Sequence, residues 1–171
     1  VAARFAELSP PPGRLEKIGG YNEPLIAIDY AHTPDALDNA IGALRGAAEA
    51  RGGALVAVFG CGGDRDRGKR PLMGEIATRL ADRVVLTSDN PRSEDPLAIL
   101  GEIRQAAVSA EVIADRAEAI RKTILEAHPA DVILLAGKGH EPYQEIAGVR
   151  RPFSDVTQAQ AALAARREER A

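Results

Sequence analysis

The chain has 171 residues, of which 45% are hydrophobic and 27% are charged, an ordinary composition for one soluble globular domain. Its formal net charge of −3 argues against a general nucleic-acid-binding protein, and no apolar run approaches the ~18 residues that predict a membrane span. A single cysteine cannot form an internal disulfide, so we expect a cytoplasmic protein. From the net charge and the apolar runs we expect neither nucleic-acid nor membrane partners.

Residues 1–20 are predicted to be a lead-in or linker. They contain a stiff, extended run from Ser9 to Gly13 that holds three prolines, and such a run commonly marks a domain boundary. The chain also begins at Val1 in the middle of a pattern, which indicates a piece of a longer polypeptide. We therefore place one domain at residues 21–171, with residues 1–20 leading into it from an earlier part of a longer polypeptide.

Apolar runs and amphipathic stretches alternate along the rest of the chain. Short continuous apolar runs predict strands buried on both faces, and the stretches between them show helical spacing. A short strand near residues 145–146 and a turn at Gly148 follow. The alternation predicts an α/β fold: a Rossmann-like, doubly wound, mostly parallel sheet of about six strands flanked by helices, in a single domain. The expected strands are 25–30, 54–59, 83–87, 111–114 and 131–136, and the expected helices are 34–51, 71–80, 96–109, 116–127 and 155–167.

A cluster of polar residues directly follows four of these strands. The clusters are Asp29–His32, Gly60–Arg70, Asp89–Arg92 and Gly137–Glu141. Doubly wound sheets bind ligands beyond the carboxyl ends of their strands, and a parallel sheet would gather all four clusters at that edge. The sequence therefore predicts one ligand site built from segments that lie far apart along the chain.

The cluster Asp89–Arg92 places a carboxylate, an amide and a guanidinium in one short loop. Asn90 precedes a proline and is expected to be extended, and Pro91 fixes its own φ, so the loop should be rigid. A negative and a positive group side by side suit a zwitterionic ligand such as an amino acid. The alternative is an ordinary turn between a strand and a helix, since Asn, Pro, Ser and Asp are common turn residues.

The glycine-rich loop after the second expected strand is a candidate anion site. Gly63 to Lys69 fits the start of a phosphate-binding P-loop, but Arg70 stands where a Ser or Thr would hold Mg²⁺. A loop whose glycines allow close backbone approach, with Lys69 and Arg70 offering charge to a carboxylate or phosphate, agrees better with the residues. The alternative is a solvated basic turn.

The two remaining clusters suggest fewer roles. Asp29 and His32 either reach a nucleotide or pair with each other to cap the turn after the first expected strand. Glu141 can accept an ammonium group, whereas the lysine and histidine beside it serve either the ligand or the loop. Cys61 is expected to be a small buried residue rather than a nucleophile, and three scattered His residues show no metal-ligand spacing. No catalytic residue and no metal site are therefore predicted.

Four motifs occur together and in order, and they carry a family resemblance. They are Asp29–Leu37 (DYAHTPDAL), Phe59–Met73 (FGCGGDRDRGKRPLM), Asp89–Arg92 (DNPR) and Gly137–Glu141 (GKGHE). With these motifs the chain resembles the C-terminal domain of the Mur ligases of peptidoglycan synthesis, and within that family the branch that adds diaminopimelate. The likeness runs from about Gly13 to the last helix.

The resemblance implies an ATP-dependent ligase that forms an amide bond. In the family, ATP phosphorylates the γ-carboxylate of D-Glu on UDP-N-acetylmuramoyl-L-Ala-D-Glu, and the amine of meso-diaminopimelate attacks the acyl phosphate. ATP and Mg²⁺ are held mainly by a central domain, over which the C-terminal domain closes. The implied partners are therefore meso-diaminopimelate, the UDP-N-acetylmuramoyl dipeptide, ATP, and the central and N-terminal domains of the same protein.

The matched motif positions imply roles for particular residues in that reaction. Arg92 can bind the distal carboxylate of diaminopimelate with two hydrogen bonds, and acidic partners can bind the distal ammonium. Lysine lacks that carboxylate, so a site built around it would reject lysine by leaving Arg92 unpaired. The implied diaminopimelate contacts are Arg70, Asp89, Asn90, Pro91, Arg92, Gly137 and Glu141, and the implied nucleotide-proximal positions are Asp29 and His32.

Several parts of the family pattern have no counterpart in this sequence. They are the central-domain P-loop with its Ser or Thr, the Mg²⁺ ligands, the modified lysine and the N-terminal uridine-nucleotide domain. We therefore expect a fragment or isolated domain that is inactive alone. Two alternatives stay open: a related domain of a ligase that adds lysine or another amino acid, and a nucleotide-binding Rossmann module without a ligase role.

Overall fold

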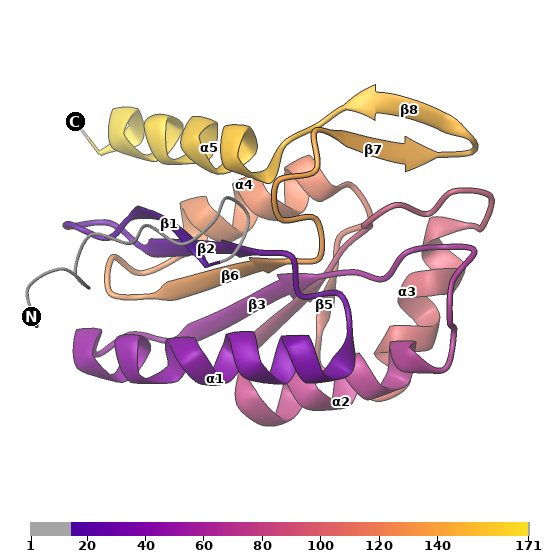
Figure 1. Ribbon diagram of the computed structural model, residues 1–171. Helices are drawn as coiled ribbons and strands as arrows, with labels where there is room; N and C mark the ends of the chain where they lie inside the picture. The colour runs from indigo at the N-terminus through magenta and orange to yellow at the C-terminus, as the bar shows by residue number, and fades with distance from the viewer. Residues whose placement is uncertain (1–14, 171) are drawn as a thin grey trace, which may run out of the picture.

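The computed structural model describes residues 15–170, which form an α/β domain with one main sheet (Figure 1). Six strands lie in the order β1-β2-β6-β3-β4-β5, and all are parallel except β1, which pairs antiparallel with β2. The predicted mostly parallel sheet is thus confirmed. The strands are β1 (Glu16–Gly19), β2 (Leu25–Asp29), β3 (Leu55–Phe59), β4 (Arg83–Leu86), β5 (Glu111–Val112) and β6 (Val132–Ala136), with β7 (Tyr143–Ile146) and β8 (Val149–Pro152) forming a separate hairpin.

Helices cover both faces of the sheet, as a doubly wound fold requires (Figure 1). In the described part of the chain, α1, α2 and α3 pack on one face, and α4 and α5 pack on the other. None of these helices is long and apolar enough to cross a membrane. The helices are α1 (Pro34–Arg51), α2 (Lys69–Leu80), α3 (Pro96–Arg104), α4 (Arg116–Glu126) and α5 (Asp155–Glu169).

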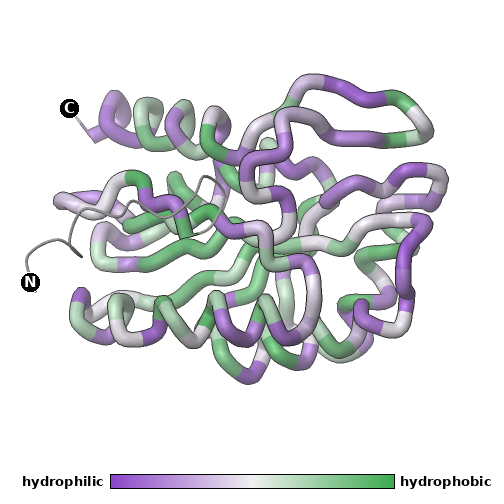
Figure 2. The backbone as a smooth tube through the Cα atoms, viewed as in Figure 1, coloured by the Kyte–Doolittle hydropathy of each residue, from purple (hydrophilic) through white to green (hydrophobic). Residues whose placement is uncertain are grey.

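The sheet has a hydrophobic layer on each face because its central strands are apolar at every position. In β3, Leu55, Ala57 and Phe59 belong to the layer under α1, α2 and α3, whereas Val56 and Val58 belong to the layer under α4 and α5. Figure 2 shows this apolar interior between more hydrophilic outer surfaces. The continuous apolar runs of the sequence therefore predicted burial on both faces correctly.

Several elements differ from the sequence-based expectation: β5 ends at Val112 rather than at residue 114, and α2 begins at Lys69 rather than at residue 71. Residues 16–19, which the sequence placed in the lead-in, form edge strand β1, so the sheet begins before residue 21. α3 ends at Arg104 rather than near residue 109, because the amides of Ala106 and Ala107 donate to carbonyls three residues earlier and the chain turns away. The connector expected from Ser9 to Gly13 lies outside the described residues.

The β7–β8 hairpin stands apart from the main sheet. Ala147 and Gly148 at its turn have φ of 50° and 73°, and positive φ at both positions matches the right-handed twist of a short hairpin. The expected strand and Gly148 turn are thus confirmed. Figure 1 shows the hairpin at the end of the molecule where the loops after β3 and β4 lie. One isolated bridge joins Ile146 of the hairpin to Arg92.

Candidate functional site

The four polar clusters meet at one end of the sheet, as predicted. They follow β2, β6, β3 and β4, which are neighbours in the sheet although they lie far apart along the chain. A pocket of about 380 Å³ lies between the loops, within the range common for small-molecule sites. The pocket is lined by Tyr30, His32, Thr33, Gly62, Arg65, Asp66, Lys69, Asp89, Asn90, Arg92, Gly137 and Glu141.

Lys138 is fully buried, and its ammonium group faces three oxygen atoms of the site. Its Nζ lies 3.0 Å from Asn90 Oδ1, 3.1 Å from Glu141 Oε2 and 3.7 Å from Asp89 Oδ1. An ammonium has three N–H donors, so this one group can engage all three side chains. Lys138 therefore has an internal role, which is to hold the loops after β4 and β6 together.

Asp89 lines the pocket but is largely buried, with 6% of its area exposed. Burial raises the pKa of its carboxyl above the usual 3.8, although Arg116 and Lys138 nearby favour the charged form. Gly137 faces this carboxyl, because a Cβ on Gly137 would lie 3.0 Å from Asp89 Oδ2. Gly137 also has a φ of 113°, which favours glycine. A side chain at position 137 would therefore displace Asp89.

Asn90 orients Glu141. Its Nδ2 donates to Glu141 Oε2 at 2.9 Å, and its Oδ1 accepts from the backbone N–H of Glu145 at 2.9 Å as well as from Lys138. Glu141 Oε1 takes no part in the bonds with Asn90 and Lys138. The Glu141 carboxylate is thus fixed through one oxygen, and we infer that the other can accept a hydrogen bond from a ligand.

Arg92 has a φ of 54°, in the left-handed region that non-glycine residues seldom adopt. Its backbone N–H donates to Glu145 O at 3.0 Å, and its Nη1 donates to Gly63 O at 2.9 Å. Within the described residues, its Nε and Nη2 donate to no acceptor. One nitrogen therefore holds the guanidinium in place while the other N–H groups can bind an anion in the pocket.

Arg70, which the motif assigns to the ligand, is fully buried and is not among the residues that line the pocket. Its guanidinium pairs with Glu94 at 2.8 Å and with Glu102 at 2.9 Å, and it also donates to Gly62 O at 3.3 Å. Arg65 of the same basic loop lines the pocket instead. The two arginines differ because α2 begins at Lys69 and turns Arg70 toward the carboxylates near and within α3.

The loop after β3 is fastened to the loop after β4. Gly63 N donates to Asn90 O at 2.9 Å, and a Cβ on Gly63 would lie only 1.8 Å from Pro91 O. Asp64 Oδ1 accepts a hydrogen bond from Ser93 Oγ at 2.6 Å. Pro91 is buried at this contact. The backbones therefore approach so closely that only glycine is accommodated at position 63.

Asp29 shapes the turn after β2, although through backbone N–H groups and not by the expected pairing with His32. Its carboxylate accepts from Ala31 N at 2.8 Å and from Leu15 N at 2.9 Å. His32 lines the pocket, and its ring meets the Tyr30 ring edge-on with centroids 4.8 Å apart. Lys69 Nζ donates to His32 O at 2.7 Å. The expected proximity of Asp29 and His32 to a nucleotide stays a prediction.

Cys61 is a small buried residue, as expected. Its Sγ lies 3.6 Å from the sulfur of Met73, and burial raises the pKa of the thiol to about 12. A thiol with that pKa is protonated at neutral pH and is a poor nucleophile. Residues 15–170 also contain no group of three His, Cys, Asp or Glu residues that could hold a metal ion.

A buried ion pair supports the site and was not predicted. Arg116 and Asp155 have fully buried side chains, and two guanidinium nitrogens lie 2.8 and 2.7 Å from the carboxylate oxygens. Arg116 also donates to Ala136 O at 3.1 Å and to Ser88 O at 3.4 Å. The pair joins α4 and α5 to the ends of β6 and β4. Only the folded arrangement brings residues 116 and 155 together, so the sequence carried no local signal for it.

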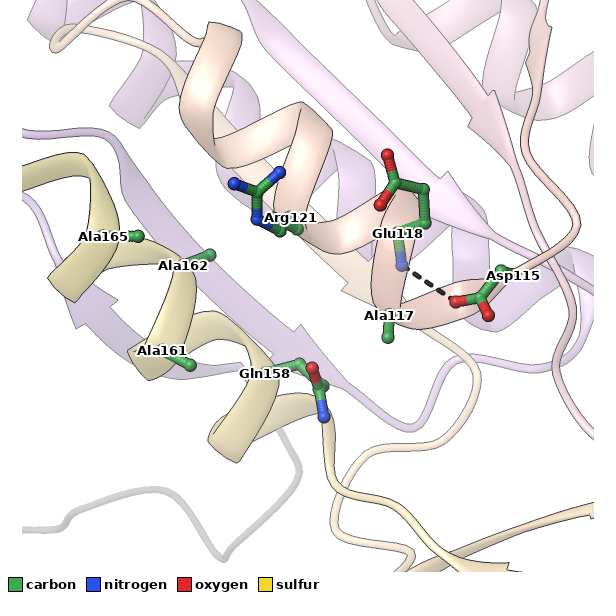
Figure 3. Close-up of a pocket in the computed structure, with 8 residues that line it drawn as sticks. All are labelled: Asp115, Ala117, Glu118, Arg121, Gln158, Ala161, Ala162 and Ala165. Atoms are coloured by element: carbon green, nitrogen blue, oxygen red, sulfur yellow. Dashed lines mark hydrogen bonds between the residues drawn. The ribbon is translucent and has the colours of Figure 1, made fainter. Parts of the chain in front are cut away.

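A second pocket lies between α4 and α5 and includes none of the four polar clusters (Figure 3). Its α5 side consists mainly of alanines, and its α4 side carries Glu118 and Arg121. Asp115 at one end accepts from the backbone N–H of Glu118 at 2.9 Å, which caps the first turn of α4. We place the candidate site at the pocket between the loops, because residues of all four clusters line it.

The fold and the pocket define a class of protein. It is a doubly wound α/β domain that presents groups of both charges at the carboxyl ends of parallel strands, where such folds bind small ligands. Residues 13–139 match the family described as "Mur ligase, glutamate ligase domain". The chain belongs to the Mur ligase family, and the resemblance carried by its motifs is confirmed.

Relatives within the family share one name. The chain is 57% identical over 166 residues to a protein of Acidovorax sp. (strain JS42) and 56% identical over 167 residues to one of Chromobacterium violaceum. Both are called UDP-N-acetylmuramoyl-L-alanyl-D-glutamate--2,6-diaminopimelate ligase, and the matches cover 94% and 96% of this chain. They cover only 33% and 34% of the relatives, so the chain spans about one third of their length.

Solved structures confirm the fold. A structure of a UDP-N-acetylmuramoyl-L-alanyl-D-glutamate--2,6-diaminopimelate ligase matches with a TM-score of 0.82 and 46% identity, over 94% of this chain and 33% of that one. The bifunctional folylpolyglutamate synthase/dihydrofolate synthase of Yersinia pestis CO92 matches with a TM-score of 0.61 and 22% identity, over 93% of this chain and 32% of that one. The second likeness shows the shared fold alone.

Proposed function

We propose that this chain is the C-terminal, amino-acid-binding part of an ATP-dependent ligase that joins meso-diaminopimelate to UDP-N-acetylmuramoyl-L-alanyl-D-glutamate in peptidoglycan synthesis. Relatives at 57% and 56% identity carry the name of that ligase. The choice of amino acid rests on one observation about Arg92, which lines the pocket. Its Nη1 bonds to the chain, whereas its Nε and Nη2 donate to no acceptor among the described residues and can therefore bind a ligand.

The distal end of diaminopimelate carries a carboxylate and an ammonium, and the pocket offers partners for both. We assign the carboxylate to Arg92, because a guanidinium matches a carboxylate with two parallel hydrogen bonds. We assign the ammonium to Glu141 and Asp89. Asn90 sets the position of Glu141, and Gly137 leaves room for the Asp89 carboxylate. Lysine would leave Arg92 without a partner, and the site would therefore select against it.

Arg70 and Pro91 enter the proposal as residues that hold the site together. The Arg70 guanidinium is engaged by Glu94 and Glu102, and Pro91 is buried against the glycine-rich loop. Arg65 lines the pocket, and its only hydrogen bond within the described residues is to Asp64 O. We therefore assign the second cationic ligand contact to Arg65 and a supporting role to Arg70.

We assign the activation step to domains that precede this chain. ATP supplies the phosphoryl group that turns the substrate carboxylate into an acyl phosphate. The run Gly63–Lys69 lacks the Ser or Thr of a P-loop. Its first two backbone N–H groups donate within the chain, that of Gly63 to Asn90 O and that of Asp64 to Glu94 Oε1, rather than to a phosphate. ATP and Mg²⁺ are therefore held mainly by a central domain, with Asp29 and His32 nearest the nucleotide. The residues of this chain bind and orient the incoming amine.

The proposal also specifies partners and compartment. Residues 1–20 would include the connection to the central domain, and residues 21–171 would close against the central and N-terminal domains of the same protein. The UDP-linked dipeptide, ATP and diaminopimelate are small polar molecules of the cytoplasm, so we place the protein there. The reaction requires no nucleic acid and no membrane partner.

Substitution of Arg92 tests the choice of amino acid. In the full-length ligase, Arg92→Ala should lower kcat/KM for meso-diaminopimelate by about a hundredfold, because a charge-assisted pair contributes about 1.5–3 kcal/mol. It should leave the much lower value for L-lysine nearly unchanged. Product formation is measured with each amino acid at several concentrations. Arg104→Ala is the matched control, since Arg104 is exposed in the last turn of α3.

Other outcomes would favour the alternatives. An unchanged ratio of the diaminopimelate and lysine values in Arg92→Ala would contradict the ligand assignment and favour a domain that adds lysine or another amino acid. Calorimetry of the full-length protein with ATP, meso-diaminopimelate and lysine separates the third class. Binding of ATP, with no binding of any amino acid even when ATP and the UDP-linked dipeptide are present, would favour a nucleotide-binding module.

A further inference from the structure

The β7–β8 hairpin is bonded to the loop that carries Arg92, although it contributes no lining residue to the pocket. The backbone of Glu145 makes two of these bonds: its N–H donates to Asn90 Oδ1 at 2.9 Å, and its carbonyl accepts from Arg92 N at 3.0 Å. A parallel bridge also pairs Arg92 with Ile146. The Arg92 loop therefore lies against β7 like a short additional strand.

Gln144 adds two bonds from its side chain. Its Nε2 donates to Asp89 O at 2.8 Å and to Ser88 O at 3.4 Å. Both acceptors are main-chain carbonyls of the segment that runs from β4 to Arg92. Arg92 itself holds a φ of 54°, in the left-handed region that is unfavourable for a residue with a Cβ. The surrounding bonds must therefore keep the loop in this conformation, and those of Gln144 fix its first half.

We propose that Gln144 is a positioning residue that sets the selectivity of the ligase for its amino acid by orienting Arg92, without touching the ligand. The inference rests on the proposed function, since it assumes that Arg92 binds the distal carboxylate. A bidentate pair between a guanidinium and a carboxylate depends on orientation, so a small rotation of the loop weakens it. Loss of the Gln144 bonds would release the carbonyls of residues 88 and 89 and permit that rotation.

The hairpin has other bonds that hold its shape, so Gln144 can be replaced without unfolding it. Phe153 N donates to Pro142 O at 3.0 Å at the open end of the hairpin, and four residue pairs align β7 with β8. Gln144 is half-buried. A residue that served only the hairpin would change stability when replaced. Replacing a positioning residue instead changes which amino acid the enzyme prefers.

Gln144→Glu in the full-length ligase is the test, because it keeps the size of the side chain and sets a carboxylate oxygen against two carbonyls. We expect KM for meso-diaminopimelate to rise about tenfold, and the preference for diaminopimelate over lysine to fall by a similar factor. The kcat, the KM for ATP and the thermal midpoint should stay close to the wild-type values. Gln144→Leu, which removes the donors without adding charge, should act in the same direction by a smaller factor.

The matched control and a double variant make the test specific. Gln160→Glu makes the same chemical change on the exposed face of α5 and should alter none of these values. Because Gln144 acts through Arg92, adding Gln144→Glu to Arg92→Ala should not change the diaminopimelate-to-lysine ratio further.

Three results would overturn the positioning role. They are an unchanged KM for diaminopimelate in both Gln144 variants, a lower thermal midpoint with an unchanged ratio, and an additive effect in the double variant. The failure of the proposed function looks different, since Arg92→Ala alone would then leave the ratio unchanged. In that case both proposals are wrong. If Arg92→Ala lowers the diaminopimelate-to-lysine ratio as expected but Gln144→Glu leaves it unchanged, only the role of Gln144 is wrong.

Discussion

The carboxyl group of Asp89 is almost completely buried. Burial raises the pKa of this group above 3.8, so the folded chain binds the proton more tightly than the unfolded chain does. For an acid with a raised pKa, stability is highest below the unfolded value and falls as pH rises through the folded value. An ionised Asp89 therefore lowers the free energy of unfolding near neutral pH, and the ligand role proposed for Asp89 gives a reason for keeping it.

Asp89→Asn should therefore separate stability from binding. We expect the variant to unfold at a higher temperature than the wild type near pH 7, and the gap to shrink as pH falls toward about 4. Binding of meso-diaminopimelate, measured by calorimetry on the full-length protein, should weaken at the same time. Glu168→Gln changes an exposed carboxyl and serves as the control. A variant less stable than the wild type at pH 7 would show that pairing with Lys138 outweighs burial.

At the scale of elements, the site depends on bonds between loops that follow different strands. Glu94 lies just before α3, and its carboxylate accepts from Arg70 of α2 and from the backbone N–H of Asp64 in the loop after β3. These bonds lower the pKa of Glu94 from 4.5 to about 2. The stability that the Glu94 carboxylate contributes is thus fully present above pH 4.5 and is lost as pH falls toward about 2.

Glu94→Gln should make the free energy of unfolding depend less steeply on pH in this acid range. The wild-type free energy of unfolding, measured with urea at a series of pH values, should fall more steeply between pH 4.5 and about 2 than that of the variant. Glu49→Gln on the exposed side of α1 should keep the wild-type slope. Equal slopes for wild type and Glu94→Gln would show that the bond between Arg70 and Glu94 does not contribute to stability.

The fold and the place of the site could be predicted from the sequence because both depend on local patterns. Continuous apolar runs such as Leu55–Phe59 predict strands buried on both faces, and a parallel sheet then gathers the loops that follow them. Local sequence patterns could not predict that Arg65 lines the pocket whereas Arg70 is buried away from it. This difference depends on where α2 begins and on Glu94 and Glu102, which lie 24 and 32 residues beyond Arg70.

Other features could not be predicted because they depend on residues that lie far apart along the chain or on weak local patterns. The internal role of Lys138 depends on Asn90, 48 residues away, and no local signal distinguishes a buried lysine from one that binds a ligand. Edge strand β1 was missed because it is short, alternates half-buried with exposed residues, and follows a proline-rich run. The bonds of Gln144 to the Arg92 loop span 55 and 56 residues.

At the scale of the whole molecule, the Arg116–Asp155 pair joins the second helical layer to the site. Both side chains are fully buried, and Arg116 bonds to the carbonyls that end β6 and follow β4. A buried pair adds little net stability over an apolar pair of the same shape, but removal of one partner leaves an uncompensated charge. The pair therefore makes the docking of α5 and the shape of the site depend on each other.

Arg116→Met should lower the free energy of unfolding by about 3–5 kcal/mol, because Asp155 would be left buried without its partner. The double variant Arg116→Met with Asp155→Leu should lose less than the sum of the single variants, which denaturant unfolding measures as a coupling free energy. Arg121 is exposed, and its side chain is drawn in Figure 3; Arg121→Met should change stability little. Strict additivity in the double variant would contradict the coupling.

The neighbouring placement of β2, β6, β3 and β4 has a consequence for evolution and for engineering. The strands carry the apolar core, and the chemistry lies in the loops beyond their ends, so residues that choose a ligand can change without disturbing the layers beneath. Under the proposed function, new amino-acid preferences are best sought by diversifying the Asp89–Arg92 loop together with Gln144 while the sheet is left intact. A library that varies the loop alone would change the loop while Gln144, which bonds to it, still favours the original loop conformation.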